Sequence, residues 1–200
     1  VAAHLGSGAS LCGLAAGVSR DTSMGFSTLD GIPMATRCGA LDPGVLLHLL
    51  GSEGRPLGEV EDILYNRSGL LGVSGISSDM RELLKRRGEP AAQEAIELFC
   101  YRARHHLAAL TASLGGIDRL VFTGGIGAYA SEIRERICQG LAYLGLRLDN
   151  TANQANAATI SAHGAAVTVQ ALVSDEEQMI AQHVLRLSAN AEKRREASCS

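Results

Sequence analysis

DRLVFTGGIG, the stretch at residues 118–127, decides the fold because it joins a short apolar run to a glycine-rich turn. Residues 119–123 are predicted to form a buried strand, and residues 123–127 contain three glycines. From Ser131 to Leu144, apolar residues recur at helical spacing. A turn without Cβ atoms lets backbone N–H groups approach a ligand closely, and a helix N-terminus adds a positive dipole end. The stretch therefore predicts a phosphate or nucleotide site between a strand and a helix.

Two common nucleotide-binding motifs can be compared with this stretch. The P-loop motif G-x-x-x-x-G-K-[ST] is absent, because neither of the two lysines follows a glycine loop. A dinucleotide fingerprint, G-x-G-x-x-A, does match at Gly125, Gly127 and Ala130. Asp149 ends a predicted strand at 145–149, where a ribose-binding acid would lie. A Rossmann core needs several further βα units, however, and only one strand and one helix are predicted to follow, so an NAD-dependent dehydrogenase domain is kept only as an alternative.

The composition as a whole is that of a globular protein. The chain has 200 residues, of which 46% are hydrophobic, enough to bury the core of one domain or of two tightly packed subdomains. A net charge of -3 argues against a nucleic-acid partner, which would require a basic face. No apolar run is long enough to span a membrane, and no signal-peptide pattern is present, so no membrane partner is expected.

The cysteines and the start of the chain add two expectations. The five cysteines are odd in number and show no CxxC or Cys/His spacing, which favours a reducing, cytoplasmic compartment over a disulfide framework or a zinc site. Val1 begins within a predicted strand and no initiator Met precedes it. We therefore expect further polypeptide upstream.

The first part of the chain is predicted to form hairpins and then a long loop. Strands are expected at 1–4 and 9–14, separated by a turn at Gly6 to Gly8 and followed by a second turn at 15–17. Residues 20–42 show little periodicity, which indicates a loop, and a long loop in a compact domain often carries function.

Helices and single strands are predicted for the remainder, so the fold class is mixed α/β. The expected elements are a helix capped by Asp42 with Pro43 at its first position, a short helix around Val60, a loop at 68–78, a helix opened by an Asp79/Glu82 capping box, a long helix at 90–114, a loop with one short strand at 151–163, a strand at 165–173 and a terminal helix opened by a Ser174/Glu177 capping box.

Six segments, in this order along the chain, resemble the C-terminal half of acetate kinases and related short-chain acyl kinases. They are HLGSGAS (4–10), DTSMGF (21–26), ATRCGALDPG (35–44), GISSDMREL (75–83), VFTGGIG (121–127) and SDEE (174–177). The resemblance implies a ribonuclease H-like/actin-like ATPase domain of the actin, sugar-kinase and Hsp70 superfamily, with opening β-hairpins, a mixed sheet and flanking helices. It also implies a C-terminal nucleotide-binding domain at 1–190, and the run of charged residues that follows predicts a frayed polar tail at 191–200.

The resemblance assigns the phosphates of ATP to two places. The loop His4, Leu5, Gly6, Ser7 and Gly8 would lie against the phosphates, whereas its glycine content alone favours a plain hairpin turn. Arg37 corresponds to the family arginine that steadies the transferring phosphoryl group, and a planar guanidinium suits that task. Without the resemblance, Arg37 would be interpreted as a surface arginine. The chain departs from the family at Ser7, where Asn is frequent, and at Ala40, where many relatives have Asp.

The nucleoside and the metal are assigned to three further segments. Asp79, Met80 and Arg81 match the family segment around the adenosine, while Asp79 would also cap a helix. The loop Gly125, Ile126, Gly127, Ala128 and Tyr129 matches the family's G-I-G-E-N, with Ala128 and Tyr129 replacing Glu-Asn. Glu176 corresponds to the family glutamate associated with Mg²⁺, which usually takes only one or two protein carboxylates. From its position alone, Glu176 would be an acid in the first turn of a helix.

The activity that the resemblance implies is reversible phosphoryl transfer between ATP and acetate or another short-chain carboxylate, giving ADP and an acyl phosphate. Mg²⁺ as cofactor and a homodimer are implied with it. In the family, the acyl-binding arginine, the catalytic aspartate, a second phosphate-contacting histidine and a Mg²⁺-associated asparagine come from the N-terminal half. Their motifs are not in this sequence, so we expect the chain alone to be inactive. A non-catalytic ATP-binding module is the second alternative.

Overall fold

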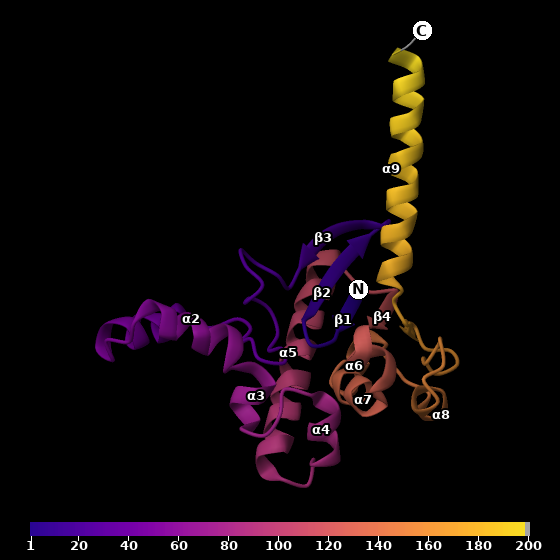
Figure 1. Ribbon diagram of the computed structural model, residues 1–200. Helices are drawn as coiled ribbons and strands as arrows, with labels where there is room; N and C mark the ends of the chain where they lie inside the picture. Colours follow the sequence, from indigo (N-terminus) through magenta and orange to yellow (C-terminus); the bar gives the residue numbers. More distant parts are fainter. Residues whose placement is uncertain (199–200) are drawn as a thin grey trace.

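The core of the protein is a five-stranded mixed sheet flanked by helices (Figure 1). The computed structural model describes the backbone of residues 1–198 and, apart from Glu176, the side chains of residues 1–188. The strands are β1 (Ala2–Leu5), β2 (Ala9–Ala15), β3 (Val18–Thr22), β4 (Arg119–Thr123) and β5 (Thr168–Ala171), in the order β3-β2-β1-β4-β5. Strands β1, β2 and β3 pair antiparallel, whereas β4 lies parallel to both β1 and β5. The predicted mixed α/β class with opening hairpins is confirmed.

Helices cover the sheet and extend from it on two sides. They are α1 (Pro43–Leu47), the π-helix η1 (His48–Ser52), α2 (Leu57–Asn66), α3 (Gly69–Ser74), α4 (Met80–Lys85), α5 (Pro90–Leu114), α6 (Gly124–Tyr129), α7 (Ser131–Gln139), the 3-10 helix η2 (Ala142–Leu144), α8 (Asn150–Gln154) and α9 (Glu176–Ser198). Figure 1 shows α5 running along the sheet, α9 projecting from one end of the molecule and α2 from another. Among the described residues, none of the helices combines the length and apolarity needed to cross a bilayer.

The long helix α5 and the sheet form the main core. Helix α5 was predicted from its apolar spacing. It buries a stripe of side chains that includes Phe99, Ala103 and Leu107. It packs close to β2, where a Cβ added at Gly13 would lie 3.3 Å from Leu114 Cδ1. On the sheet, alternate residues of β1 and β4 point into the same core, as expected for strands with period 2. This core sets the carboxyl ends of the parallel strands β1 and β4 side by side.

Two segments that were predicted to be loops contain regular secondary structure. Strand β3 includes residues 20–22 of the predicted loop at 20–42; all five of its residues are exposed, so no apolar alternation marked it. Its position is secured by tertiary contact, since the Ser113 hydroxyl of α5 donates a 2.6 Å hydrogen bond to Asp21. The predicted loop at 68–78 contains helix α3 instead. Its first residue, Gly69, has φ of +59°, and a Cβ there would lie 2.7 Å from Arg37 O, so this glycine allows close packing rather than a loop.

The region after α7 also departs from the prediction. The helix predicted to reach Leu144 ends at Gln139 and is followed by η2. The predicted strand at 145–149 is wrong, because only an isolated bridge joins Leu148 to Ser161. Asp149 instead caps α8 by accepting a hydrogen bond from Ala152 N at 2.9 Å, so part of the predicted loop at 151–163 is helical. Strand β5 is shorter than the predicted 165–173.

The helix caps were predicted in part. Asp42 accepts from Gly44 N at 2.7 Å with Pro43 at the first helical position, as predicted. Asp79 caps α4, but through Arg81 N, and the Glu82 carboxylate pairs with Lys85 instead of completing a capping box. At α9 the predicted Ser174 cap is wrong, because Asp175 accepts from Gln178 N at 2.8 Å. The boundary predicted near residue 190 stays a prediction, since the side chains from 189 onward lie outside the described part.

Candidate functional site

Two adjoining cavities open where β1 and β4 end. The first has a volume of about 810 Å³ and the second about 880 Å³, and both are lined by Gly6, Ser7 and Gly125. In open α/β sheets, ligands bind beyond the carboxyl ends of the parallel strands, and both cavities lie at this end of β1 and β4. The predicted glycine segments therefore meet at the junction of the two cavities.

The first cavity gathers most of the residues predicted to contact phosphates. Its walls include His4, Gly6, Ser7, Gly8 and Arg37. The turn between β1 and β2 is closed by a 3.0 Å hydrogen bond from Gly6 N to Gly8 O. His4 is oriented by a 3.0 Å hydrogen bond between its Nδ1 and Thr123 Oγ1. A ring fixed in this way beside a glycine turn suits the binding of an anion.

Arg37 lies over the turn between β1 and β2. A Cβ added at Gly8 would be 3.4 Å from Arg37 Nη2, while Arg37 Nη1 donates to Thr28 O at 3.0 Å. The hydrogen bond from Nη1 holds Nη2 above the turn. The Arg37 side chain is half-buried, and its remaining N–H groups are available to a ligand in the cavity. A guanidinium has five N–H donors in a planar fork, which matches two oxygens of a phosphoryl group.

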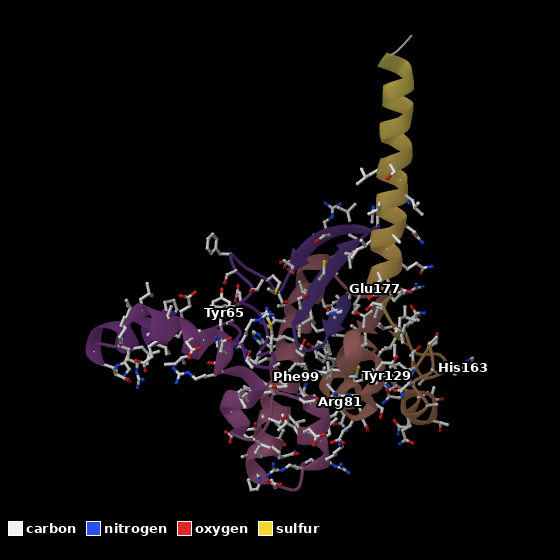
Figure 2. All side chains as sticks on the ribbon, viewed as in Figure 1. Tyr65, Arg81, Phe99, Tyr129, His163 and Glu177 are labelled. Atoms are coloured by element: carbon white, nitrogen blue, oxygen red, sulfur yellow. The ribbon has the colours of Figure 1, made fainter. Side chains whose placement is uncertain are left out.

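The backbone around Arg37 is braced by hydrogen bonds from neighbouring helices. The backbone N–H groups of Leu70 and Leu71 in α3 donate to Met34 O and Ala35 O at 2.8 and 3.1 Å. The Thr36 hydroxyl donates to Tyr65 O of α2 at 2.7 Å. Tyr65 is labelled on α2 in Figure 2. These bonds hold Arg37 on a rigid segment within the predicted long loop, which is the condition for positioning a catalytic side chain.

The second cavity gathers the residues predicted for the nucleoside. Asp79, Met80 and Arg81 of α4 line it opposite Ile126 and Tyr129 of α6. Figure 2 labels Arg81 and Tyr129 on these two neighbouring elements. Arg81 Nη2 donates to Asp79 Oδ2 at 2.6 Å, and this hydrogen bond lowers the pKa of Asp79. The wall therefore combines an exposed ion pair with apolar and aromatic side chains, as ligand pockets commonly do.

The glycine-rich stretch forms helix α6 rather than the predicted turn. Gly124 starts it with φ of +75°, and a Cβ there would lie 2.8 Å from Leu5 C, so α6 packs directly on the end of β1. Gly127 and Ala128 are buried behind the cavity wall, and the Leu5 side chain is buried in the core. Those three residues were predicted to contact the nucleotide, but they are not among the residues that line the two cavities.

The predicted metal ligand lies at the beginning of α9. Glu176 is the first residue of that helix, and its side chain lies outside the described part of the chain. Its neighbours Asp175 and Glu177 line the first cavity, and Figure 2 shows Glu177 at the base of α9. Carboxylate oxygens are hard donors of the kind that Mg²⁺ prefers, so the donor chemistry here fits that ion. In the described residues no three His, Cys, Asp or Glu side chains cluster as a protein-only metal site.

Several cavity residues were missed by the sequence analysis. In the first cavity they are Ala9, Ser10, Met24, Met34, Gly124, Val173, Ser174, Asp175 and Glu177; in the second they are Ala35, Ser78, Leu84, Lys85, Arg87 and Ala130. Helical spacing would have found Leu84 and Lys85, because they lie one turn after Met80 and Arg81 on α4. Placing the cap of α9 at Asp175 instead of Ser174 would have pointed to the cavity residues around Asp175.

The dinucleotide alternative finds no support in this geometry. It required a strand at 145–149 ending in a ribose-binding acid, whereas Asp149 caps α8. Its Gly125 and Gly127 lie within α6 rather than in a phosphate-binding turn, and Ala130 caps the end of that helix.

Comparison with known proteins shows the family to which the chain is similar. Residues 1–182 match the model of the Acetokinase family. An acetate kinase from Rhodopseudomonas palustris (strain TIE-1) is 54% identical over 190 residues, covering 94% of the chain and 48% of the relative. The chain thus spans about half the length of the curated relatives it matches.

Solved structures give the same result for the fold. A Porphyromonas gingivalis acetate kinase superposes with a TM-score of 0.88 at 36% identity, covering 92% of the chain and 48% of that protein. A Francisella tularensis propionate kinase superposes with a TM-score of 0.85 at 38% identity, covering 90% and 47%. These similarities, together with the mixed sheet, confirm the predicted actin-like ATPase fold class. With a family model matched over most of its length and a site assembled from the expected motifs, the chain belongs to the acetokinase family.

Proposed function

We propose that the protein containing this chain transfers a phosphoryl group reversibly between ATP and acetate or another short-chain carboxylate. The observation that supports this most directly is the pair of cavities joined at Gly6, Ser7 and Gly125. One cavity carries Arg37 and the glycine turn, and the other carries apolar and aromatic side chains. Together they offer a phosphate compartment that continues into a nucleoside compartment.

The chemistry asks little of the protein beyond positioning and charge neutralisation. A carboxylate oxygen attacks the γ-phosphorus, the new O–P bond forms as the bond to the bridging β–γ oxygen breaks, and ADP leaves with that oxygen. No proton has to be removed from the nucleophile. Arg37, fixed by Thr28 O and the braced segment around it, would donate to the oxygens of the transferring group as their charge redistributes.

Mg²⁺ fits the carboxylates at the start of α9. Glu176, with Asp175 and Glu177 beside it, would hold the ion, and phosphate oxygens and water would complete its ligands. A bound Mg²⁺ supplies neutralisation of phosphate charge. The role of this chain is then to bring carboxylates to the same cavity as Arg37.

We expect the chain to bind Mg·ATP and not to turn over by itself, because the family groups that bind the acyl part are expected from the N-terminal half. The test measures acetyl phosphate formation by the 200-residue chain and by the protein completed with that half. The completed protein should be active, with Arg37→Ala lowering kcat about 100-fold or more. Arg147→Ala is the matched control, because Arg147 is an exposed arginine whose side chain donates to Gly164 O and does not line either cavity.

The alternatives predict different results in the same experiment. Turnover by the chain alone that Arg37→Ala abolishes would contradict the need for a second half. A completed protein that binds Mg·ATP and stays inactive would indicate a non-catalytic ATP-binding module. Thermal protection by NAD and not by Mg·ADP would indicate the dehydrogenase alternative.

A homodimer in the cytoplasm is part of the proposal. The region of α1, η1 and α2 exposes large apolar side chains, including Leu47 at 72% and Leu57 at 71%. Exposed apolar side chains gathered on projecting helices favour an interface. Sedimentation of the completed protein should show a dimer, and Leu47→Asp with Leu57→Asp should shift it to the monomer.

A further inference from the structure

Arg134 of α7 is the largest fully buried side chain of the described core, although it carries a charge. Its guanidinium makes four hydrogen bonds, all to neutral oxygens. They run from Nε to Asn153 Oδ1 at 2.8 Å, from Nη1 to Gly127 O at 2.8 Å, from Nη2 to Asn153 O at 2.7 Å and from Nη2 to Asn156 Oδ1 at 2.7 Å. We call this set of residues the Arg134 clamp.

A buried cation without an acid partner needs another source of compensation. Among the described side chains, no ion pair includes Arg134, and burial lowers its pKa, although an arginine stays protonated. The compensation comes from carbonyl groups in the last turns of two helices. Gly127 O belongs to the last turn of α6 and Asn153 O to the last turn of α8, where helix carbonyls have spare acceptor capacity; Asn153 O also accepts from Asn156 N at 3.1 Å.

The clamp is itself held in place from both sides. Asn153 is buried, and its Nδ2 donates to Ser131 O at the start of α7 with a length of 3.0 Å. Asn156 adopts a φ of +52°, which turns the chain after α8. The guanidinium thus joins α6, α7 and α8 through one side chain.

Helix α6 is the element that carries Ile126 and Tyr129 to the second cavity. Its beginning is fixed by the packing of Gly124 on β1, and its last turn by the hydrogen bond from Arg134 to Gly127 O. The distance between α6 and the opposite wall on α4 therefore depends on a residue that does not line the cavity.

We propose that Arg134 is a positioning residue for the nucleoside part of the ligand. By holding Gly127 O, it sets how far Ile126 and Tyr129 reach into the second cavity. To the first cavity α6 contributes only its first two residues, of which Gly124 packs on β1. This inference rests on the proposed function, because it assigns the second cavity to the nucleoside of ADP and ATP.

The test compares two probes by calorimetry on the 200-residue chain with Mg²⁺ present. ADP would occupy both cavities, whereas pyrophosphate fits the phosphate cavity alone. Arg134→Lys offers one ammonium in place of the fork, so ADP should bind about tenfold more weakly, while the Kd of pyrophosphate changes less than about twofold. Arg136→Gln is the matched control, because Arg136 lies on the same helix and pairs with Glu132; it should change neither constant.

A second variant keeps the test decisive if Arg134→Lys does not fold. Asn156→Gly removes one acceptor and suits the positive φ, so it should weaken ADP about threefold and spare pyrophosphate. Equal affinity of this variant and the unmodified chain for ADP, or an equal loss for both probes, would overturn the positioning role. If the unmodified chain binds neither probe, the proposed function itself fails.

Discussion

Arg37 Nη2 lies 3.4 Å from the point that a Cβ on Gly8 would occupy, so the turn between β1 and β2 and the predicted catalytic arginine share one wall of the phosphate cavity. A methyl group fits at that distance, but a branched side chain would displace the guanidinium. Gly8→Val should therefore weaken Mg·ATP binding about tenfold, whereas Gly8→Ala should stay within about twofold. Calorimetry measures both constants. Equal affinity of Gly8→Val and the unmodified chain would show that the guanidinium does not contact the phosphates.

Gly69 packs against the backbone of the segment that carries Arg37. Its φ of +59° and the nearby oxygens of Met34 and Arg37 leave no room for a side chain. Gly69→Ala should lower the free energy of unfolding by more than about 3 kcal/mol, because backbone strain and a clash with backbone add together. Gly75→Ala is the control, since Gly75 has φ of +62° and open space around its Cβ position, and should cost about 1 kcal/mol. Urea unfolding measures the free energy of unfolding of both variants. Similar losses for the two would mean that the backbone around Arg37 shifts to accommodate the added methyl group.

The parts of the fold that the sequence predicts best are those with long or alternating apolar patterns. Helix α5 shows its buried stripe over 25 residues, and β1 and β2 alternate. Helices α3, α6 and α8 have only five or six residues each and are rich in glycine or polar side chains. A helix so short does not form from its own propensity and depends on tertiary packing. The strand predicted at 145–149 failed for the related reason that local alternation does not supply a neighbour to pair with.

The candidate site also has parts that the sequence predicted and parts that it did not. The ordered motifs placed the glycine turn, Arg37 and the segment at Asp79 in adjoining cavities, because each motif is local and the fold brings the motifs together. Helical spacing puts Arg134 on the same face as the buried Ile137 and Cys138, but the sequence does not show the backbone and amide oxygens that allow a charged side chain to be buried there. The α9 cap was placed one residue early because Ser174 and Asp175 are both good capping residues.

Tyr129 is the most distinctive residue of the nucleoside cavity. It stands where the family motif has Asn, and its side chain is exposed at 61% on the cavity wall. An aromatic ring there can stack on a nucleobase, so Tyr129→Ala should weaken ADP binding about fivefold and leave pyrophosphate unaffected. Tyr129→Phe keeps the ring and should bind ADP like the unmodified chain. If the phenylalanine variant loses as much affinity as the alanine variant, the hydroxyl and not the ring makes the contact.

The buried thiols of Cys100 and Cys138 should make the stability depend on pH in the alkaline range. Burial raises the pKa of each thiol from 9.0 to about 12. A raised pKa in the folded state means that the unfolded chain loses these protons first, so the free energy of unfolding is at its full value below pH 9 and decreases as the pH rises toward 12. Each thiol should contribute a loss of about 1.4 kcal/mol between pH 8 and pH 10. Urea unfolding at both pH values, compared with a Cys100→Ala/Cys138→Ala double variant, isolates this contribution from that of other groups. The double variant should be less stable at pH 8 because of its cavities, yet lose less stability on going to pH 10. An identical loss in both proteins would mean that the two thiols ionise as readily in the folded chain as in the unfolded one.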